Sequence, residues 1–323
     1  RRFNFRLILM LGIPLLRISQ CFAALSQRPL MFAGILILGG AAIAVIEVAV
    51  NLEADRVEAH IGHRIMNRSH AYWSFGFFGA GIVGAGFSQL GISPFSHFAL
   101  ITVLSSVLTI LLFAKYDAAK ARRQSVAEKN KGFVWPSQGI FLLVFFSLSA
   151  MLVEGASIDW SVIFMRDIFN TVPIVSGLSL ALAAIAQGII RYFADQFVDK
   201  YGPERVSFYS LIAMVLGVGC VVFSFEPITA LLGFLLMGGG SAVIFPLAMS
   251  AAAQRTDKTP EENVASLAQF VFVIFLLAPP ILGFVAEYAG LRWSFALCFP
   301  LLIVSFFTIH SLNVQKDEKK NAY

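Results

Sequence analysis

Long apolar runs alternate with short polar segments along the whole chain. Residues 71–114, 168–190 and 206–225 each contain no Asp, Glu, Lys or Arg. A helix crosses the hydrocarbon core of a bilayer with about 20 mostly apolar residues, and that core excludes charged side chains. The pattern predicts ten spans: 7–25, 30–51, two within 71–114 that are separated at 91–94, 138–158, 172–193, 206–225, 228–252, 264–286 and 292–312.

The polar segments divide these spans into two groups. A mixed-charge loop is expected over 52–69, and the longest polar loop, 115–137, carries six basic and two acidic residues. We predict an all-α polytopic membrane protein with a four-span bundle over 1–114, a cytoplasmic linker over 115–137, a six-helix bundle over 138–314 and a cytoplasmic tail over 315–323.

Composition supports the same class of protein. Hydrophobic residues make up 58% of the 323 residues and charged residues 13%, whereas soluble domains carry about 25% charged residues. The net charge of +5 does not indicate nucleic-acid binding, because the basic residues lie in short loops between spans. The three cysteines sit in apolar segments, so we assign them no disulfide or metal.

The positions of the basic residues predict the orientation. Of the 24 Lys and Arg residues, 19 fall in alternate loops and the two termini, which ten spans place on one side. Three (Arg28, Arg166 and Arg292) fall on the other side, and Arg17 and Arg191 lie in or near spans. Loops rich in Lys and Arg remain in the cytoplasm. Both termini are therefore expected to be cytoplasmic.

The division into four and six spans indicates a known architecture. Transporters built from two six-helix halves place a long cytoplasmic linker between the halves. A chain of four and six spans is what such a protein looks like without its first two helices, and the sequence does not begin with Met. We therefore expect the first two helices to be missing.

One charged stretch, GIIRYFADQFVDKYGPER over 188–205, separates two apolar runs. We predict a tight turn at the membrane surface, broken at Gly202-Pro203. Its spacing resembles the loop signature of the major facilitator superfamily, although Glu204 stands where that signature favours basic residues. The matching positions are Gly188, Arg191, Asp195, Asp199, Lys200, Gly202 and Arg205.

Three further stretches narrow the resemblance. They are EVAVN over 47–51, HAYWSFG over 70–76 and EGASIDW over 154–160. Together they resemble the fucose-permease-related branch of the superfamily, including its YbjJ-like inner-membrane members. The resemblance implies a monomeric secondary transporter of the inner or plasma membrane, which moves a sugar or another small polar solute by alternating access, without a cofactor and with a proton gradient as the driving force.

Polar residues within the predicted spans are candidates for the substrate and proton pathway. A carboxylate at membrane depth is costly and indicates a function. Glu154 either takes up and releases a proton or is a structural hydrogen-bonding residue, and the same alternatives hold for Glu47. Asp159 and Trp160 are expected near the outer end of their span. The full candidate set is Glu47, Asn51, His70, Trp73, Glu154, Asp159 and Trp160.

The charged stretch over 188–205 has a different expected role. Charge pairs at helix ends can hold one conformation and release in another. We expect Arg191 and Asp199 each to take part in such a latch between adjacent helices, within a gating loop, the alternative being a solvated turn.

Enzyme functions are disfavoured, because the sequence holds no Walker-type loop, H-E-x-x-H or G-x-S-x-G. The alternatives to a transporter of this superfamily are a native ten-helix carrier of another fold and a membrane sensor or scaffold that does not transport.

Overall fold

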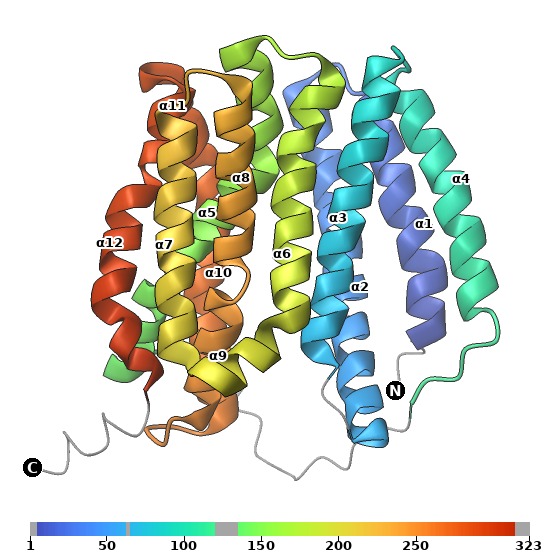
Figure 1. The fold of residues 1–323 in the computed structure, drawn as a ribbon. Coiled ribbons are helices and arrows are strands. Elements are labelled where there is room, and N and C mark those ends of the chain that lie inside the picture. Colours follow the sequence, from blue (N-terminus) through green and yellow to red (C-terminus); the bar gives the residue numbers. More distant parts are fainter. Residues whose placement is uncertain (1–4, 63–64, 120–134, 314–323) are drawn as a thin grey trace, which may run out of the picture. The chain divides into compact units, whose positions relative to one another are not determined.

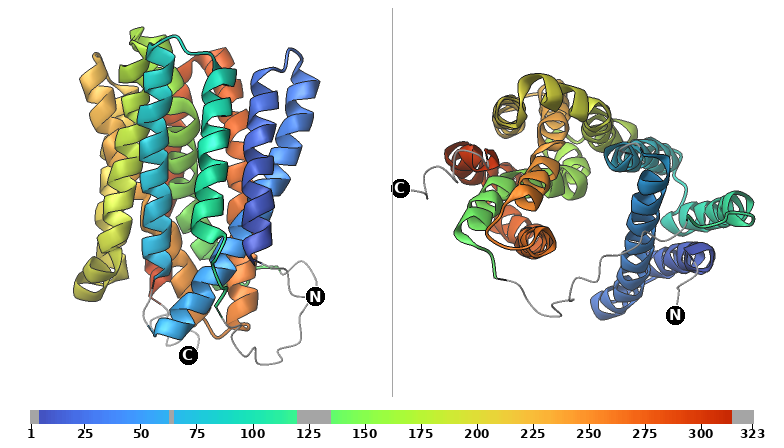
Figure 2. Two further views of the ribbon diagram at one scale, coloured as in Figure 1. Left: turned by 90° about the vertical axis from the view of Figure 1, so that its right-hand side faces the viewer. Right: turned by 90° about the horizontal axis from the view of Figure 1, so that it is seen from below.

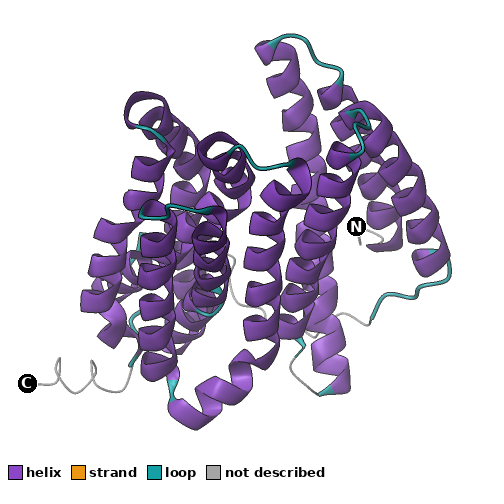
Figure 3. Cartoon of the chain, turned by 45° about the horizontal axis from the view of Figure 1, so that its top comes forward, coloured by secondary structure: helices purple, strands orange, loops and turns teal. Residues whose placement is uncertain are grey.

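The computed structural model describes residues 5–62, 65–119 and 135–313. These residues form helices joined by short loops, and no strand occurs among them (Figure 3). The chain falls into two compact units, one of Arg1–Ser69 with Gly86–Glu128 and the other of His70–Ala85 with Lys129–Tyr323. Most of the predicted linker and all of the predicted tail lie outside the described residues.

The first unit contains α1 (Phe5–Ala24), α2 (Pro29–Ile61), α4 (Pro94–Phe113) and the two ends of α3 (Met66–Gln89). Helix α1 packs against both α2 and α4 (Figure 2). Phe5, Leu9 and Ala49 form its small buried core.

Helix α2 extends further than predicted, because residues 52–61 are helical rather than a loop. No Gly or Pro interrupts that segment, and the helix ends only at Gly62, whose φ of 71° suits glycine. The buried Glu53 carboxylate stabilises the extension. It accepts hydrogen bonds from Tyr116 Oη at 3.0 Å and from Arg56 Nη1 at 3.2 Å.

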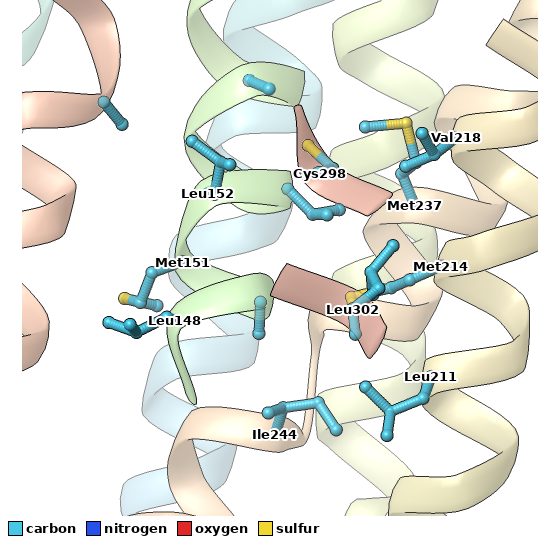
Figure 4. Close-up of a cluster of buried hydrophobic side chains, with 14 of the residues drawn as sticks. Leu148, Met151, Leu152, Leu211, Met214, Val218, Met237, Ile244, Cys298 and Leu302 are labelled. Atoms are coloured by element: carbon cyan, nitrogen blue, oxygen red, sulfur yellow. The ribbon is translucent and has the colours of Figure 1, made fainter. Parts of the chain in front are cut away.

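The second unit contains the middle of α3 and the C-terminal helices: α5 (Gln138–Phe169), α6 (Pro173–Tyr201), α7 (Pro203–Val222), α8 (Pro227–Ser241), α9 (Ile244–Gln254), α10 (Pro260–Ala289), α11 (Leu291–Ala296) and α12 (Cys298–Thr308) (Figure 1). Helix α5 packs against α6, α8, α10 and α12, so it is the centre of this unit. Figure 4 shows part of the core, including Leu148, Met214, Met237 and Leu302.

Every predicted span corresponds to helix in the structure. Among the described residues, nine helical segments are long and apolar enough to cross a membrane, and α3, with its polar first turn, is not one of them. The span predicted over 228–252 consists of α8 and α9 with a break at residues 242–243. Helix α10 runs continuously through Pro279 and Pro280.

Helices α3 and α6 approach each other closely within the second unit. A Cβ on Gly188 would lie 2.6 Å from the Phe75 ring, and one on Gly177 would lie 2.3 Å from Ala85 Cβ. A side chain on Gly177 would force the helices apart, and one on Gly188 would displace the Phe75 ring. Small residues here bring polar groups of α3 into contact with α6.

Candidate functional site

A part-buried ion pair lies in the second unit. Glu154 is in the middle of α5, and Arg191 is on α6. Arg191 Nη2 lies 3.1 Å and 3.3 Å from the two carboxylate oxygens of Glu154. The Arg191 and Glu154 side chains are only 13% and 14% exposed. Each charge therefore depends on the other for most of its compensation.

The remaining donors of Arg191 reach two further elements. Nε donates to the Ala242 carbonyl oxygen at 3.1 Å, and Nη1 donates to Ser74 Oγ of α3 at 3.4 Å. Ala242 stands at the break between α8 and α9, where a main-chain carbonyl lacks its helical partner. One guanidinium thus connects α3, α5, α6 and the broken helix.

A set of neutral polar side chains continues from the ion pair. Ser74 Oγ is placed to donate to Gln187 Oε1 at 3.1 Å, and Gln187 Nε2 donates to Ser241 Oγ at 3.5 Å. All three side chains are buried. Hydroxyl and amide groups can reverse donor and acceptor roles, so this set can adjust when the charge on Glu154 changes.

A small cavity adjoins this cluster. Its lining includes Glu154, Gln187 and Ser241, with Trp73 and Phe77 of α3. Its volume is about 20 Å³, which is room for about one water molecule. The helices must therefore move before a larger solute can enter.

Several predicted site residues lie in this region. Glu154 and Trp73 line the cavity, and Arg191 holds Glu154. The His70 main-chain carbonyl accepts a hydrogen bond from Ser74 Oγ at 3.4 Å, while the His70 residue as a whole is exposed. The structure thus brings Glu154, Trp73 and Arg191 together, and their functional roles stay predictions.

The prediction for Asp159 and Trp160 is wrong in position. Helix α5 continues to Phe169 and ends at Asn170 in the left-handed conformation, so these two residues lie well inside the helix. Asp159 is exposed, and the Trp160 ring would lie 3.3 Å from a Cβ on Gly283 of α10. Neither residue is in the lining of the small cavity.

The charged stretch over 188–205 is mostly helix rather than turn. Helix α6 continues to Tyr201, and Gly202 alone, with φ of 80°, joins it to α7. Arg191 pairs with Glu154 of the neighbouring helix α5, and the latch role of Arg191 and Asp199 stays a prediction. Asp199 is exposed eight residues further along the same helix, which is about 12 Å away.

The other predicted residues of this stretch line α6 and α7. Gly188 lies against Phe75, as described above, and Lys200 Nζ lies 5.1 Å from the centre of the Tyr201 ring. Asp195 and Arg205 are exposed. A gating role for the stretch stays a prediction.

Glu47 and Asn51 belong to α2 in the first unit. They lie four residues apart on one helix face, as predicted, with Glu47 exposed and Asn51 half-buried. Their assignment to a substrate or proton pathway stays a prediction.

The sequence prediction missed Ser74, Gln187 and Ser241. A signal for Gln187 was present, because it is the only amide side chain between Asn170 and Arg191 and stands four residues before Arg191. Residues four apart share a helix face. Ser74 similarly follows His70 by four residues. No sequence signal singles out the Ala242 carbonyl.

Comparison with known proteins gives consistent matches. A model of the Major Facilitator Superfamily matches residues 1–274 and again residues 142–322. An uncharacterised transporter y4wD of Sinorhizobium fredii is 31% identical over 292 residues, covering 90% of this chain and 76% of the relative. An uncharacterised MFS-type transporter of Yersinia pestis is 28% identical over 304 residues, covering 92% of this chain and 74% of the relative.

Solved structures share the fold. The nucleoside transporter NupG matches with a TM-score of 0.69 at 14% identity, covering 97% of this chain and 84% of that one. The Escherichia coli fucose:proton symporter FucP matches with a TM-score of 0.60 at 16% identity, covering 94% and 84%. The family model spans most of this chain, and the apolar helices agree with it. The chain therefore belongs to the Major Facilitator Superfamily, whose members are multi-pass membrane transporters rather than enzymes.

Proposed function

We propose that this transporter is a secondary carrier of a small polar solute, a sugar or a related metabolite, and that Glu154 couples transport to protons. The observation that carries the proposal is the part-buried ion pair between Glu154 and Arg191 beside the small cavity. The fold likeness to the fucose:proton symporter FucP agrees with this solute class.

Protonation of Glu154 changes the balance of charge in the cluster. The ionised carboxylate neutralises Arg191, and this attraction holds α5 against α6. A proton on Glu154 removes that attraction and leaves the guanidinium with neutral acceptors, Ser74 Oγ and the Ala242 carbonyl. A protein with two conformations shifts toward the one in which a charged group is better compensated. Proton binding therefore favours a rearrangement of these helices.

The solute binds where this rearrangement opens the cavity. The lining offers hydrogen-bonding groups from Gln187 and Ser241 opposite the aromatic rings of Trp73 and Phe77. Such a combination suits a solute with hydroxyl groups and an apolar ring face. Alternating access then occurs by movement of one half against the other around a site near the membrane midplane.

The test uses the purified chain in liposomes that contain a pH-sensitive dye. Neutral hexoses, including fucose, and nucleosides are added outside, and the internal pH is followed. We expect at least one solute to acidify the interior. Glu154→Gln should abolish this acidification while preserving exchange of labelled solute across the membrane, because only the protonatable group has been lost.

Glu226→Gln is the matched control, since Glu226 is an exposed carboxylate outside the cluster; its acidification should equal that of the wild type. If no solute moves protons and none shifts the melting temperature, a sensor or scaffold is the better assignment. If Glu154→Gln acidifies the interior as the wild type does, proton coupling at this residue is refuted.

We also propose that the chain lies in the inner or plasma membrane with both ends in the cytoplasm, on the basis of its basic residues, and that it acts as a monomer, as the family resemblance implies. A fluorescent protein fused to the C-terminus should fluoresce, and alkaline phosphatase fused there should be inactive. The opposite pattern would reverse the topology.

A further inference from the structure

A second, much larger cavity lies on another face of the second unit. It is a groove of about 790 Å³ between α6 and α7, with α8 as its floor. Helix α8 contacts both neighbours, and Gly202 joins α6 to α7 at one end of the groove, next to the lining residue Tyr201. Its volume falls within the range of roughly 300–1,000 Å³ that is typical of ligand sites.

The lining of the groove is almost entirely hydrocarbon and aromatic. Helix α6 contributes residues from Ile185 to Tyr201, which is a length of about 24 Å along the helix. Gly239 and Gly240 lie on the floor, where the lack of side chains deepens it. The hydrocarbon layer of one leaflet is about 15 Å deep. A groove of about 24 Å that begins at the membrane surface is therefore longer than one leaflet is deep.

One cationic side chain lies at the end of the groove where Gly202 joins α6 to α7. Arg205, in the first turn of α7, is part of the lining and is exposed. Among the described residues it forms no ion pair or hydrogen bond. Tyr201 and Tyr209 flank it, and tyrosine is enriched at the level of lipid headgroups.

We propose that this groove binds one glycerophospholipid, with an acyl chain along α8 and the phosphate against Arg205. The two halves of the site match the two halves of such a molecule. The long apolar groove suits an acyl chain. The unpaired guanidinium of Arg205 suits a phosphate, because a guanidinium binds a phosphate with two parallel hydrogen bonds. A soluble polar ligand would leave the hydrocarbon lining unused, and a peptide would bring main-chain groups that the lining cannot satisfy.

The groove and the ion-pair cluster share a wall. Gly239 and Ile190 line the groove, while their neighbours Gly238 and Arg191 belong to the cavity and the cluster. The lipid therefore contacts the same turns of α6 and α8 that hold the candidate site. Its binding does not depend on which solute the protein carries.

The binding test uses the full chain in detergent and native mass spectrometry, with dioleoylphosphatidylglycerol as the probe. We expect one molecule per chain to bind before any others. Dioleoylglycerol, which lacks the phosphate, should bind about tenfold more weakly. Glycerol 3-phosphate, which lacks the chains, should not displace the lipid.

Two pairs of variants separate the head and tail contacts. Arg205→Gln should reduce the affinity for the phospholipid about tenfold, so that the phospholipid binds no more tightly than dioleoylglycerol. Lys200→Gln removes a charge in the last turn of α6, outside the lining, and should change the affinity for the phospholipid less than twofold. Gly239→Leu should fill the groove, because its Cβ has only two neighbours, both at 3.8 Å. Gly219→Leu, with nothing within 4 Å and outside the lining, is its control.

Loss of the first bound lipid in Arg205→Gln and Gly239→Leu, but not in their controls, supports the proposal. Equal binding of the two lipids by the wild type, equal losses in a variant and its control, or displacement by glycerol 3-phosphate would each overturn it. A transport defect in Glu154→Gln leaves these measurements unchanged, so the two proposals fail separately.

Discussion

Replacing Glu154 with glutamine tests whether the part-buried ion pair with Arg191 stabilises the second unit. Glutamine keeps the shape of the side chain and one carbonyl acceptor for Arg191, but it removes the negative charge. The guanidinium then keeps its hydrogen bonds to Ser74 and Ala242 without a counter-ion. The change therefore isolates charge compensation from packing.

The magnitude follows from the geometry. At about 3.2 Å and an effective dielectric constant of about 20, the attraction between the charges is roughly 5 kcal/mol before desolvation is subtracted. Breaking a buried pair from one side costs about 3–5 kcal/mol. Since both side chains keep 13–14% exposure, we take the lower end, about 3 kcal/mol. For a unit of this size, that corresponds to a melting temperature lower by roughly 6–12 °C.

The assay is a double-mutant cycle measured by thermal unfolding in detergent. Glu154→Gln and Arg191→Gln should each destabilise the protein, and the double variant should be more stable than the sum predicts, because no uncompensated charge remains. The exposed pair Arg166–Asp167, with side chains 64% and 43% exposed, is the control cycle, and its coupling should be below about 0.5 kcal/mol. If the double variant loses as much unfolding free energy as the sum of the two single variants, the reasoning is refuted.

Two further predictions concern the second unit. Gly238→Ala should destabilise the second unit by about 1–3 kcal/mol, because the added Cβ would lie 2.1 Å from a main-chain carbonyl oxygen of α6. Gly239→Ala is the control and should be tolerated, because the nearest atoms to its Cβ lie at 3.8 Å. Equal melting temperatures for the two variants would contradict this packing. Burial alone would raise the pKa of Asp257, between α9 and α10, but a hydrogen bond from the Ser137 hydroxyl and the charge of Arg255 outweigh it and hold the pKa below its usual range. Asp257 therefore stabilises the fold above about pH 4, and this contribution is lost as the pH falls through its lowered pKa. Melting temperatures at pH 6, 4 and 3 should converge for wild type and Asp257→Asn at the lowest pH, and a constant difference would contradict the assignment.

Hydrophobic patterning was enough to predict the helices but not where they end. Each predicted span is largely helical because main-chain groups in a bilayer must bond internally. The predicted helix ends are wrong for a physical reason. A charged residue marks where a helix leaves the hydrocarbon, whereas the helix itself stops only where its main-chain hydrogen bonding is interrupted. Helix α5 passes Asp159 and ends at Asn170, and α6 passes Asp195 and ends at Gly202.

The members of the candidate site were predicted unequally. Glu154 and Arg191 stood out because a charge within an apolar run is rare. Ser74 and Ser241 did not, since serine is common in spans and its hydroxyl usually bonds to its own helix. The Ala242 carbonyl became an acceptor only because α8 breaks there, after a run of three glycines whose consequence depends on the packing of neighbouring helices.

The partner of Arg191 was not predicted, although it could have been. Two charges on different helices each lower the cost of burying the other only if they meet. Glu154 and Arg191 were the two charges placed deepest in neighbouring predicted spans, so their mutual compensation was a possible inference from the sequence. Arg17 in α1 gives a contrast: its Nη1 donates to the neutral Gln20 at 2.9 Å, and its Nε is buried without a partner among the described residues. The depth of a charge within its span is thus a useful guide to charge pairing in a membrane.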